Sequence, residues 1–145
     1  MKVLLLHGKE SQPGGAKAQA IEDAGHELIN PDLRTGWAEA VQTAQDAVDE
    51  HNPDIVVGSS RGGALAMNID TNGAPRVLIA PAWKMFGSAN TVPGGTVILH
   101  SPADDIILFE DSEELVANSG AKLVAVGSNH RMSDSEALAA MVGYL

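Results

Sequence analysis

Short runs of apolar residues recur along the chain, and each run is continuous rather than alternating with polar positions. Runs of this kind are typical of strands that are buried on both faces of a sheet. Val3 to Leu6 is one of them, and Arg76 to Ala80 is another. The pattern predicts six strands, at residues 3–6, 27–30, 54–58, 76–80, 96–100 and 122–126.

Between these runs, apolar residues recur at intervals of three and four, which is the period of a helix. Trp37, Val41 and Val48 lie on one such stripe. Ser133, followed by Glu136 three residues later, has the pattern of a capping box at the start of the last helix. Helices are predicted at 14–24, 37–50, 62–68, 111–119 and 133–144. The alternation predicts an α/β fold, a three-layer sandwich in which a mostly parallel sheet of about six strands has helices on both faces.

The chain of 145 residues has the length of one domain with one core, so we expect a single domain across residues 1–145. The longest irregular stretch, Trp83 to Gly95, is rich in glycine, proline, serine and asparagine and is predicted to be a surface loop. Two interpretations of this loop remain open. It forms a wall or a small lid of a pocket, or it is a crossover connection without a role in binding.

The composition argues against several classes of partner and several kinds of site. The chain has 19 acidic and 9 basic residues, a net charge of −10, which argues against nucleic acid and anionic membranes as partners. It contains no cysteine, which excludes disulfides, cysteine-ligated metals and a cysteine nucleophile. The apolar run at the N-terminus is too short for a signal peptide, and no segment is long enough to span a membrane. We therefore expect a cytoplasmic protein.

The segment 55–66 has the pattern of a strand, a sharp turn and a helix, with Ser60 at the turn. Its spacing Gly58-x-Ser60-x-Gly62 matches the nucleophile elbow of hydrolytic enzymes. In such an elbow the serine adopts a strained backbone conformation, and the glycines let neighbouring segments pack close to it. The pattern predicts that the Ser60 hydroxyl lies above the end of a sheet and faces the start of a helix.

Two further reactive groups follow predicted strands. The pair Asp104 and Asp105 lies after the strand at 96–100, and His130 lies after the last strand. Because the carboxyl ends of parallel strands share one edge of a sheet, we expect these side chains to lie near Ser60. A serine hydroxyl needs a base to take its proton, and histidine titrates near neutrality. A carboxylate fixes the tautomer of the imidazole.

These residues resemble the α/β-hydrolase superfamily in a minimal, lidless form, and in particular the RBBP9-like and YqiA-like small bacterial hydrolases. The chain order serine, aspartate, histidine is that of the superfamily. The resemblance is carried by the oxyanion loop His7-Gly8, the elbow at 58–63, the segment 100–107 and the histidine loop at 127–130. In the superfamily the aspartate precedes an aliphatic residue by three positions, and the spacing to Ile107 therefore favours Asp104 over Asp105.

The resemblance also implies an oxyanion hole formed by the backbone N–H groups of Lys9 and Arg61. It implies a structural hydrogen bond for His7 rather than proton transfer. For the side chains of Lys9, Glu10 and Arg61 two interpretations remain open: they line the entrance of the site, or they only face water. The cap domain of the superfamily usually enters where this chain has only the loop 83–95, so we expect a preference for small acyl groups.

Other residues compete for these roles. Asp32 follows the second predicted strand and is a third candidate carboxylate, with capping of the next connection as its alternative role. His26 and His51 lie near helix ends and are expected to be solvated. His100 ends a predicted strand and is expected to be a half-buried histidine with satisfied hydrogen bonds.

We therefore expect a serine hydrolase that cleaves a small-molecule acyl substrate, an ester or a thioester, without a cofactor or a metal. The alternatives are a non-catalytic binding module on the same scaffold, and a peptidase or amidase with the same three residues. No histidine pair has the i,i+4 spacing of metal ligands, and Pro13-Gly14-Gly15 lacks the pattern of a phosphate-binding loop. The sequence does not specify the oligomeric state.

Overall fold

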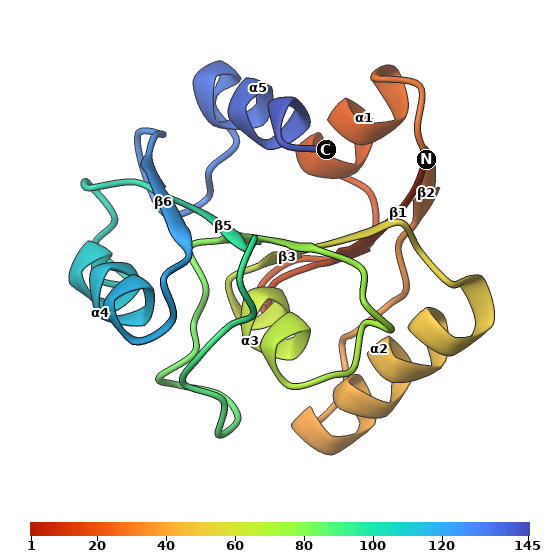
Figure 1. Ribbon diagram of the computed structural model, residues 1–145. Helices are drawn as coiled ribbons and strands as arrows, with labels where there is room; N and C mark the ends of the chain where they lie inside the picture. Colours follow the sequence, from red (N-terminus) through yellow and green to blue (C-terminus); the bar gives the residue numbers. More distant parts are fainter.

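Six strands form one sheet in the computed structural model, which describes residues 1–145 (Figure 1). The strands are β1 (Lys2–Leu6), β2 (Glu27–Ile29), β3 (Ile55–Ser59), β4 (Arg76–Ile79), β5 (Val97–His100) and β6 (Lys122–Ala125). Their order across the sheet is β2-β1-β3-β4-β5-β6, and every neighbouring pair is parallel. The carboxyl ends of all strands therefore lie at the same edge of the sheet, where the loops that follow them can form a site.

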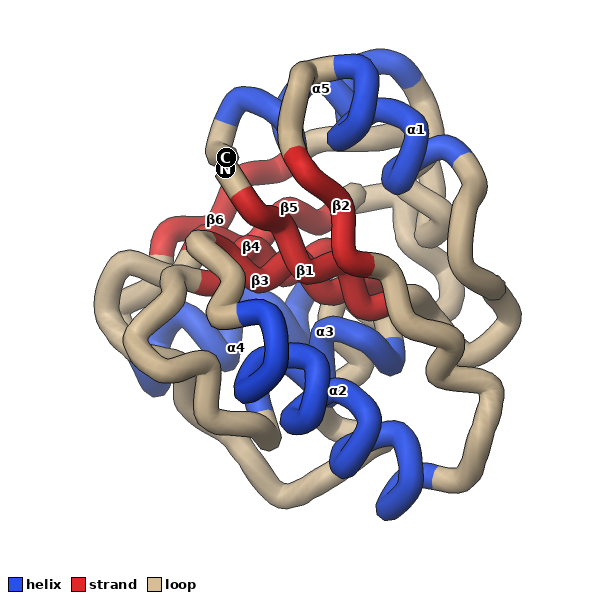
Figure 2. The backbone as a smooth tube through the Cα atoms, turned by 90° about the vertical axis from the view of Figure 1, so that its right-hand side faces the viewer, coloured by secondary structure: helices blue, strands red, loops and turns tan.

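Five helices cover the two faces of this sheet. They are α1 (Ala16–Asp23), α2 (Trp37–His51), α3 (Arg61–Met67), α4 (Phe109–Ser119) and α5 (Ser135–Gly143). Helices α1 and α5 lie on one face, and α2, α3 and α4 lie on the other (Figure 1), a separation that is also visible from the side in Figure 2. The predicted α/β fold with helices on both faces is confirmed.

The strands are apolar throughout because both of their faces are covered. Leu4 and Leu6 of β1 belong to the apolar cluster beneath α2 and α3. Val3 and Leu5 of the same strand belong to the cluster beneath α1 and α5. This arrangement explains why the strand segments appear as continuous apolar runs in the sequence. None of the helices combines the length and the apolar character needed to cross a membrane.

All predicted element boundaries lie within two residues of the observed ones. Helix α1 begins later than predicted because the two glycines before it have positive φ angles, outside the helical range. The predicted capping box of the last helix is wrong. The N-cap is Asp134 rather than Ser133, and its carboxylate accepts the N–H of Ala137. A carboxylate and a hydroxyl both cap helices well, so the sequence alone did not separate these neighbours.

Glycine residues allow α3 to begin directly beside β1 and β3. A Cβ atom on Gly58 would overlap the carbonyl oxygen of Gly62. A Cβ atom on Gly62 would in turn overlap the carbonyl oxygen of Leu6. This is the close packing that the elbow spacing predicts, and it places Ser60 at the carboxyl edge of the sheet.

Replacement of Gly62 by alanine is expected to destabilise the fold, because the added Cβ meets the backbone of Leu6. The backbone of β1 cannot yield without moving the centre of the sheet, and overpacking of this kind costs about 1–3 kcal/mol. Urea unfolding measures the change in the free energy of unfolding. Gly94→Ala is the matched control, because nothing lies within 4 Å of the Cβ that it adds. Equal losses in the two variants would show that the close approach of α3 to β1 is not needed.

Candidate active site

Ser60 lies in the turn between β3 and α3 with φ 57° and ψ −116°, a conformation that residues other than glycine rarely adopt. Backbone hydrogen bonds hold it there. Its N–H donates to the Ile79 carbonyl (2.9 Å), which ties the turn to the end of β4. Its own carbonyl accepts from the N–H of Ala82 (3.0 Å) and from the first turn of α3. The strain at Ser60 is therefore imposed by the elements on both sides of it.

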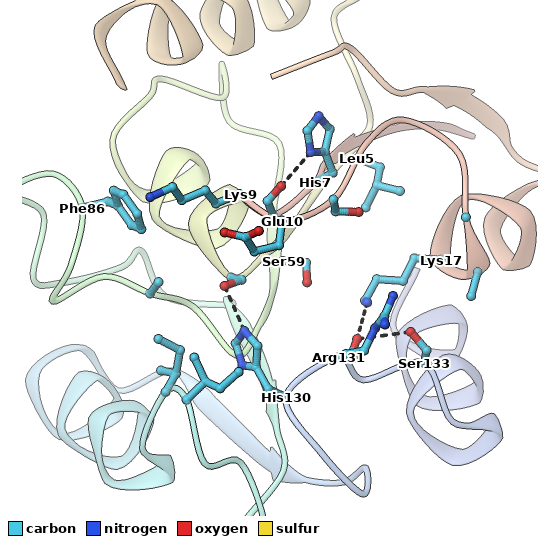
Figure 3. Close-up of a pocket in the computed structure, with 18 of the residues that line it drawn as sticks. Leu5, His7, Lys9, Glu10, Lys17, Ser59, Phe86, His130, Arg131 and Ser133 are labelled. Carbon is cyan, nitrogen blue, oxygen red and sulfur yellow. Dashed lines mark hydrogen bonds between the residues drawn. The ribbon is translucent and has the colours of Figure 1, made fainter. Parts of the chain in front are cut away.

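Three side chains that are distant in the sequence meet beside this turn. The Ser60 Oγ lies 3.0 Å from the Nε2 of His130, which is in the loop after β6. Figure 3 labels His130 and draws this hydrogen bond as the dashed line that ends on its ring. The Nδ1 of His130 lies 2.7 Å from the Oδ2 of Asp104, in the loop after β5. In a neutral imidazole that donates its Nδ1–H to a carboxylate, Nε2 has a free lone pair that can accept the proton of the serine hydroxyl. The structure thus joins the three side chains that the sequence analysis selected.

The carboxylate of Asp104 is buried and fully engaged in hydrogen bonds. Its Oδ1 accepts the N–H groups of Ile106 and Ile107, both at 2.8 Å. Burial by itself raises the pKa of Asp104, but the hydrogen bonds from His130 and from the two N–H groups outweigh it, so the pKa lies below its ordinary value. Asp105 is exposed, which makes Asp104 the carboxylate of this site.

His100 also binds Asp104, a contact that the sequence analysis missed. Its side chain is fully buried rather than half-buried, and its Nε2 lies 3.0 Å from the Asp104 Oδ2 and 3.0 Å from the Ile107 carbonyl. Nε2 therefore carries the proton, and Nδ1 accepts from the Ser112 hydroxyl at 2.6 Å. The only sign of this contact in the sequence is the spacing of four residues between His100 and Asp104. That spacing brings the two side chains together only because the chain turns after β5.

The loop after β1 passes directly beside Ser60. The Nδ1–H of His7 donates to the Gly8 carbonyl (2.8 Å), and its Nε2 accepts the Leu33 N–H (2.8 Å). His7 is buried, and backbone groups occupy both of its ring nitrogens. A Cβ on Gly8 would lie 3.4 Å from the Cβ of Ser60, so the backbone that leads to Lys9 approaches the hydroxyl closely.

The side chain of Arg61 neither lines the entrance nor faces water, so both interpretations of it are wrong. It is buried, and its guanidinium donates to the carbonyls of Leu33 (2.9 Å) and Thr35 (2.7 Å). It also lies 5.8 Å from the ring centre of Trp37 and 5.6 Å from that of Phe86. Arg61 therefore connects the segment before α2 to the loop after β4. Its backbone N–H remains at the first turn of α3, where a helix has no internal acceptor for it.

A cavity of about 520 Å³ opens over Ser60 and His130. Its apolar wall contains side chains from the loops after β4 and β5, namely Met85, Phe86, Ile106 and Ile107. Met85 and Phe86 belong to the loop 83–95, so the interpretation of this loop as a pocket wall is correct. Lys9 and Glu10 also line the cavity, which agrees with the interpretation that places them at the entrance.

The competing candidates lie outside this cluster. Asp32 forms a salt bridge with Arg34 (2.6 Å), and the hydrogen bonds and charge of this guanidinium hold the Asp32 pKa well below its ordinary value. His26 and His51 are partly exposed and do not line the cavity. No group of three or more histidine, aspartate or glutamate side chains has an arrangement that could hold a metal ion.

Comparison with solved structures places the fold among the α/β-hydrolases. A protein from Xanthomonas campestris pv. campestris that is assigned to this superfamily is 23% identical with a TM-score of 0.77, and the match covers 99% of this chain and 94% of that one. Alpha/beta hydrolase domain-containing protein 10 from mouse is 15% identical with a TM-score of 0.78, covering 98% and 86%. Est1E from Butyrivibrio proteoclasticus is 13% identical with a TM-score of 0.72, covering 98% and 84%.

A comparison with curated protein sequences finds no match. The model of the family described as uncharacterised protein family UPF0227 matches residues 2–92, a range that contains β1 to β4 and the elbow at Ser60. This range is more than half of the chain. The chain therefore belongs to the UPF0227 family, and its fold is that of the α/β-hydrolase superfamily.

Proposed function

We propose that this protein is a serine hydrolase that cleaves small acyl esters or thioesters through an acyl-enzyme on Ser60. The observation that carries the proposal is the continuous contact from the Ser60 hydroxyl to His130 (3.0 Å) and from His130 to Asp104 (2.7 Å). Hydroxyl, imidazole and carboxylate in this order are what a weak alcohol nucleophile needs in order to react near neutral pH.

In the first half of the reaction, the Ser60 Oγ attacks the acyl carbon while His130 Nε2 accepts the hydroxyl proton. Asp104 keeps the other ring nitrogen protonated and stabilises the imidazolium that forms. Collapse of the tetrahedral intermediate breaks the bond to the alcohol or thiol. The imidazolium of His130 gives its proton to this leaving group, and the acyl group remains on Ser60.

The negative oxygen of the tetrahedral intermediate needs hydrogen-bond donors. The N–H groups of Lys9 and Arg61 are suited to this task. Arg61 directly follows Ser60, Lys9 directly follows Gly8, which lies against Ser60, and neither N–H donates to another protein group. Loss of one such donor typically raises the barrier by about 3 kcal/mol. Because the donors belong to the backbone, the burial of the Arg61 side chain does not interfere with this role.

In the second half, a water molecule attacks the acyl carbon and His130 takes its proton. When the second tetrahedral intermediate collapses, the bond between the acyl carbon and the Ser60 oxygen breaks, the imidazolium of His130 returns its proton to that oxygen, and the carboxylic acid is released. Apart from this water molecule, the proposed steps use only groups of the chain and of the substrate. An amide would follow the same steps, so the preference for an ester or thioester is part of the proposal and must be tested on substrates.

Ser60→Ala is expected to abolish turnover of p-nitrophenyl acetate, because the Ser60 hydroxyl is the one that is hydrogen-bonded to His130. The fold should stay intact, as followed by circular dichroism. A fluorophosphonate probe should label the wild-type protein at Ser60 and leave the variant unlabelled, as read by mass spectrometry of the intact chain. Turnover at the wild-type rate in the variant would refute the proposal. Absence of an adduct on the wild-type protein would favour a non-catalytic binding module.

Asp104→Asn is expected to lower kcat by about 10⁴-fold, because an amide no longer holds His130 in the reactive tautomer. The neighbouring variant Asp105→Asn removes the same charge from an exposed position and is the matched control. It should retain nearly full activity in the same p-nitrophenyl acetate assay. Comparable losses in the two variants would mean that the contact between Asp104 and His130 does not serve catalysis.

Esters of short acids are expected to react faster than those of long ones. The apolar wall is short and open, since Met85 is 64% and Ile106 is 65% exposed, so the far end of a long chain would stay in water and gain little. The values of kcat/KM across p-nitrophenyl esters from acetate to palmitate measure this preference. Faster cleavage of the long-chain esters than of acetate and butyrate would contradict it.

A further inference from the structure

The cavity over Ser60 is lined by positive charge, although the protein as a whole is strongly acidic. The chain has 19 acidic and only 9 basic residues. Three of the basic residues line this cavity, Lys9, Lys17 and Arg131, whereas the only Asp or Glu residue among its lining is Glu10. The balance of charge at the site is thus the reverse of the balance over the whole protein.

Lys17 and Arg131 come from opposite ends of the chain and form a pair of like charges. The ammonium of Lys17, on α1, donates to the backbone carbonyl of Arg131 in the loop before α5, at 2.6 Å. Burial and the charge of Arg131 lower the pKa of Lys17 to about 8. An anion bound beside the Lys17 ammonium and the Arg131 guanidinium would interact favourably with both charges.

Neither of these cations has a carboxylate partner within the protein. Arg34 pairs with Asp32, and Lys84 bridges two acidic residues of α4. Lys17 and Arg131 form no salt bridge, and the Arg131 guanidinium donates to no protein acceptor. Five other basic residues also lack a salt bridge, so this absence does not by itself distinguish the pair. What distinguishes Lys17 and Arg131 is that they contact each other on the wall of the cavity beside His130, where an anionic group of a ligand can meet both.

The pair lies on the opposite side of the site from the apolar wall. Arg131 directly follows His130, and Figure 3 shows Lys17 and Arg131 on one side of the His130 ring, with Phe86 and the side chain of Lys9 on the other. Lys17 and Arg131 therefore lie across the His130 ring from Phe86, and Lys9 is the one cation on the side of Phe86. A second space of about 460 Å³ shares Arg131 with this cavity, and no apolar residue lines it.

We propose that the substrate of this site is an ester or thioester that carries a carboxylate, and that Lys17 and Arg131 bind this carboxylate. The inference rests on the proposed hydrolase function and adds the class of substrate. The two oxygens of a carboxylate accept hydrogen bonds from the guanidinium fork of Arg131 and from the Lys17 ammonium together. The uncharged part of the substrate then packs against Phe86 and its neighbours on the apolar wall.

The test compares esters that are matched in everything except charge. Mono-p-nitrophenyl adipate and p-nitrophenyl hexanoate have acyl chains of the same length, and only the first carries a carboxylate. The pair 4-acetoxybenzoate and 4-acetoxybenzamide places the charge on the alcohol side instead. With each kcat/KM normalised to the rate of uncatalysed hydrolysis, we expect the charged member of one pair to be favoured by about tenfold. The pair that shows the preference identifies the side of the ester that the two cations bind.

Lys17→Met and Arg131→Met are each expected to lower this charged-to-neutral ratio by about tenfold. The ratio cancels any general loss of activity that a variant causes. Lys122→Met is the matched control, because its ammonium lies over the Tyr144 ring and outside the cavity. Higher ionic strength should lower the ratio of the wild-type protein as well. If neutral and charged esters are cleaved equally well in both pairs, the carboxylate site is refuted and the hydrolase proposal stands.

If none of the four esters is cleaved, the hydrolase proposal fails. Whether Lys17 and Arg131 bind a carboxylate is then tested by a binding measurement instead of an activity assay. The Ser60→Ala variant is then titrated with monomethyl adipate and with dimethyl adipate, and binding is followed by NMR chemical shifts. Tighter binding of the monoanion, lost when Arg131→Met is added, supports the site. Equal binding of the two compounds overturns it.

Discussion

The contact between the start of α3 and the backbone of β1 governs the geometry of the whole site. At Gly62 the two backbones approach so closely that no Cβ atom fits between them. This approach forces Ser60 into a positive-φ conformation, at a typical cost of about 1–3 kcal/mol. The sheet withstands that strain because hydrogen bonds tie Ser60 to β4 and to Ala82. The serine is therefore positioned by the most deeply buried part of the fold rather than by a mobile loop.

The second constraint is the need to satisfy a buried carboxylate. Asp104 receives hydrogen bonds from two backbone N–H groups, His100 and His130, so that its negative charge is compensated without contact with water. His100 is in turn fixed by Ser112 of α4. The resulting chain of contacts runs from α4 through β5 to Ser60 and links the orientation of His130 to the packing of α4 on the sheet. A buried network of this kind keeps its geometry only if every polar group in it has its hydrogen-bond partners.

Properties that depend on the backbone pattern were predictable from the sequence, and those that depend on side-chain direction were not. The strands follow from continuous apolar runs, and the meeting of Ser60 with His130 follows from their positions after parallel strands. The direction of the Arg61 side chain depends on Trp37 and Phe86, which belong to other elements and meet only in the folded chain. The burial of His100 beneath α4 depends on the same kind of tertiary contact.

The charge of the protein has opposite effects on an anionic substrate at long and at short range. A net charge of −10 repels an anion that approaches from a distance. At physiological ionic strength, however, charges more than about 8 Å apart are largely screened, so only nearby groups act on a bound substrate. Lys17 and Arg131 are such groups, and the hydrogen bonds they offer do not depend on the field of the whole molecule. Selection of a carboxylate by this site would therefore arise from contacts made after entry rather than from electrostatic steering.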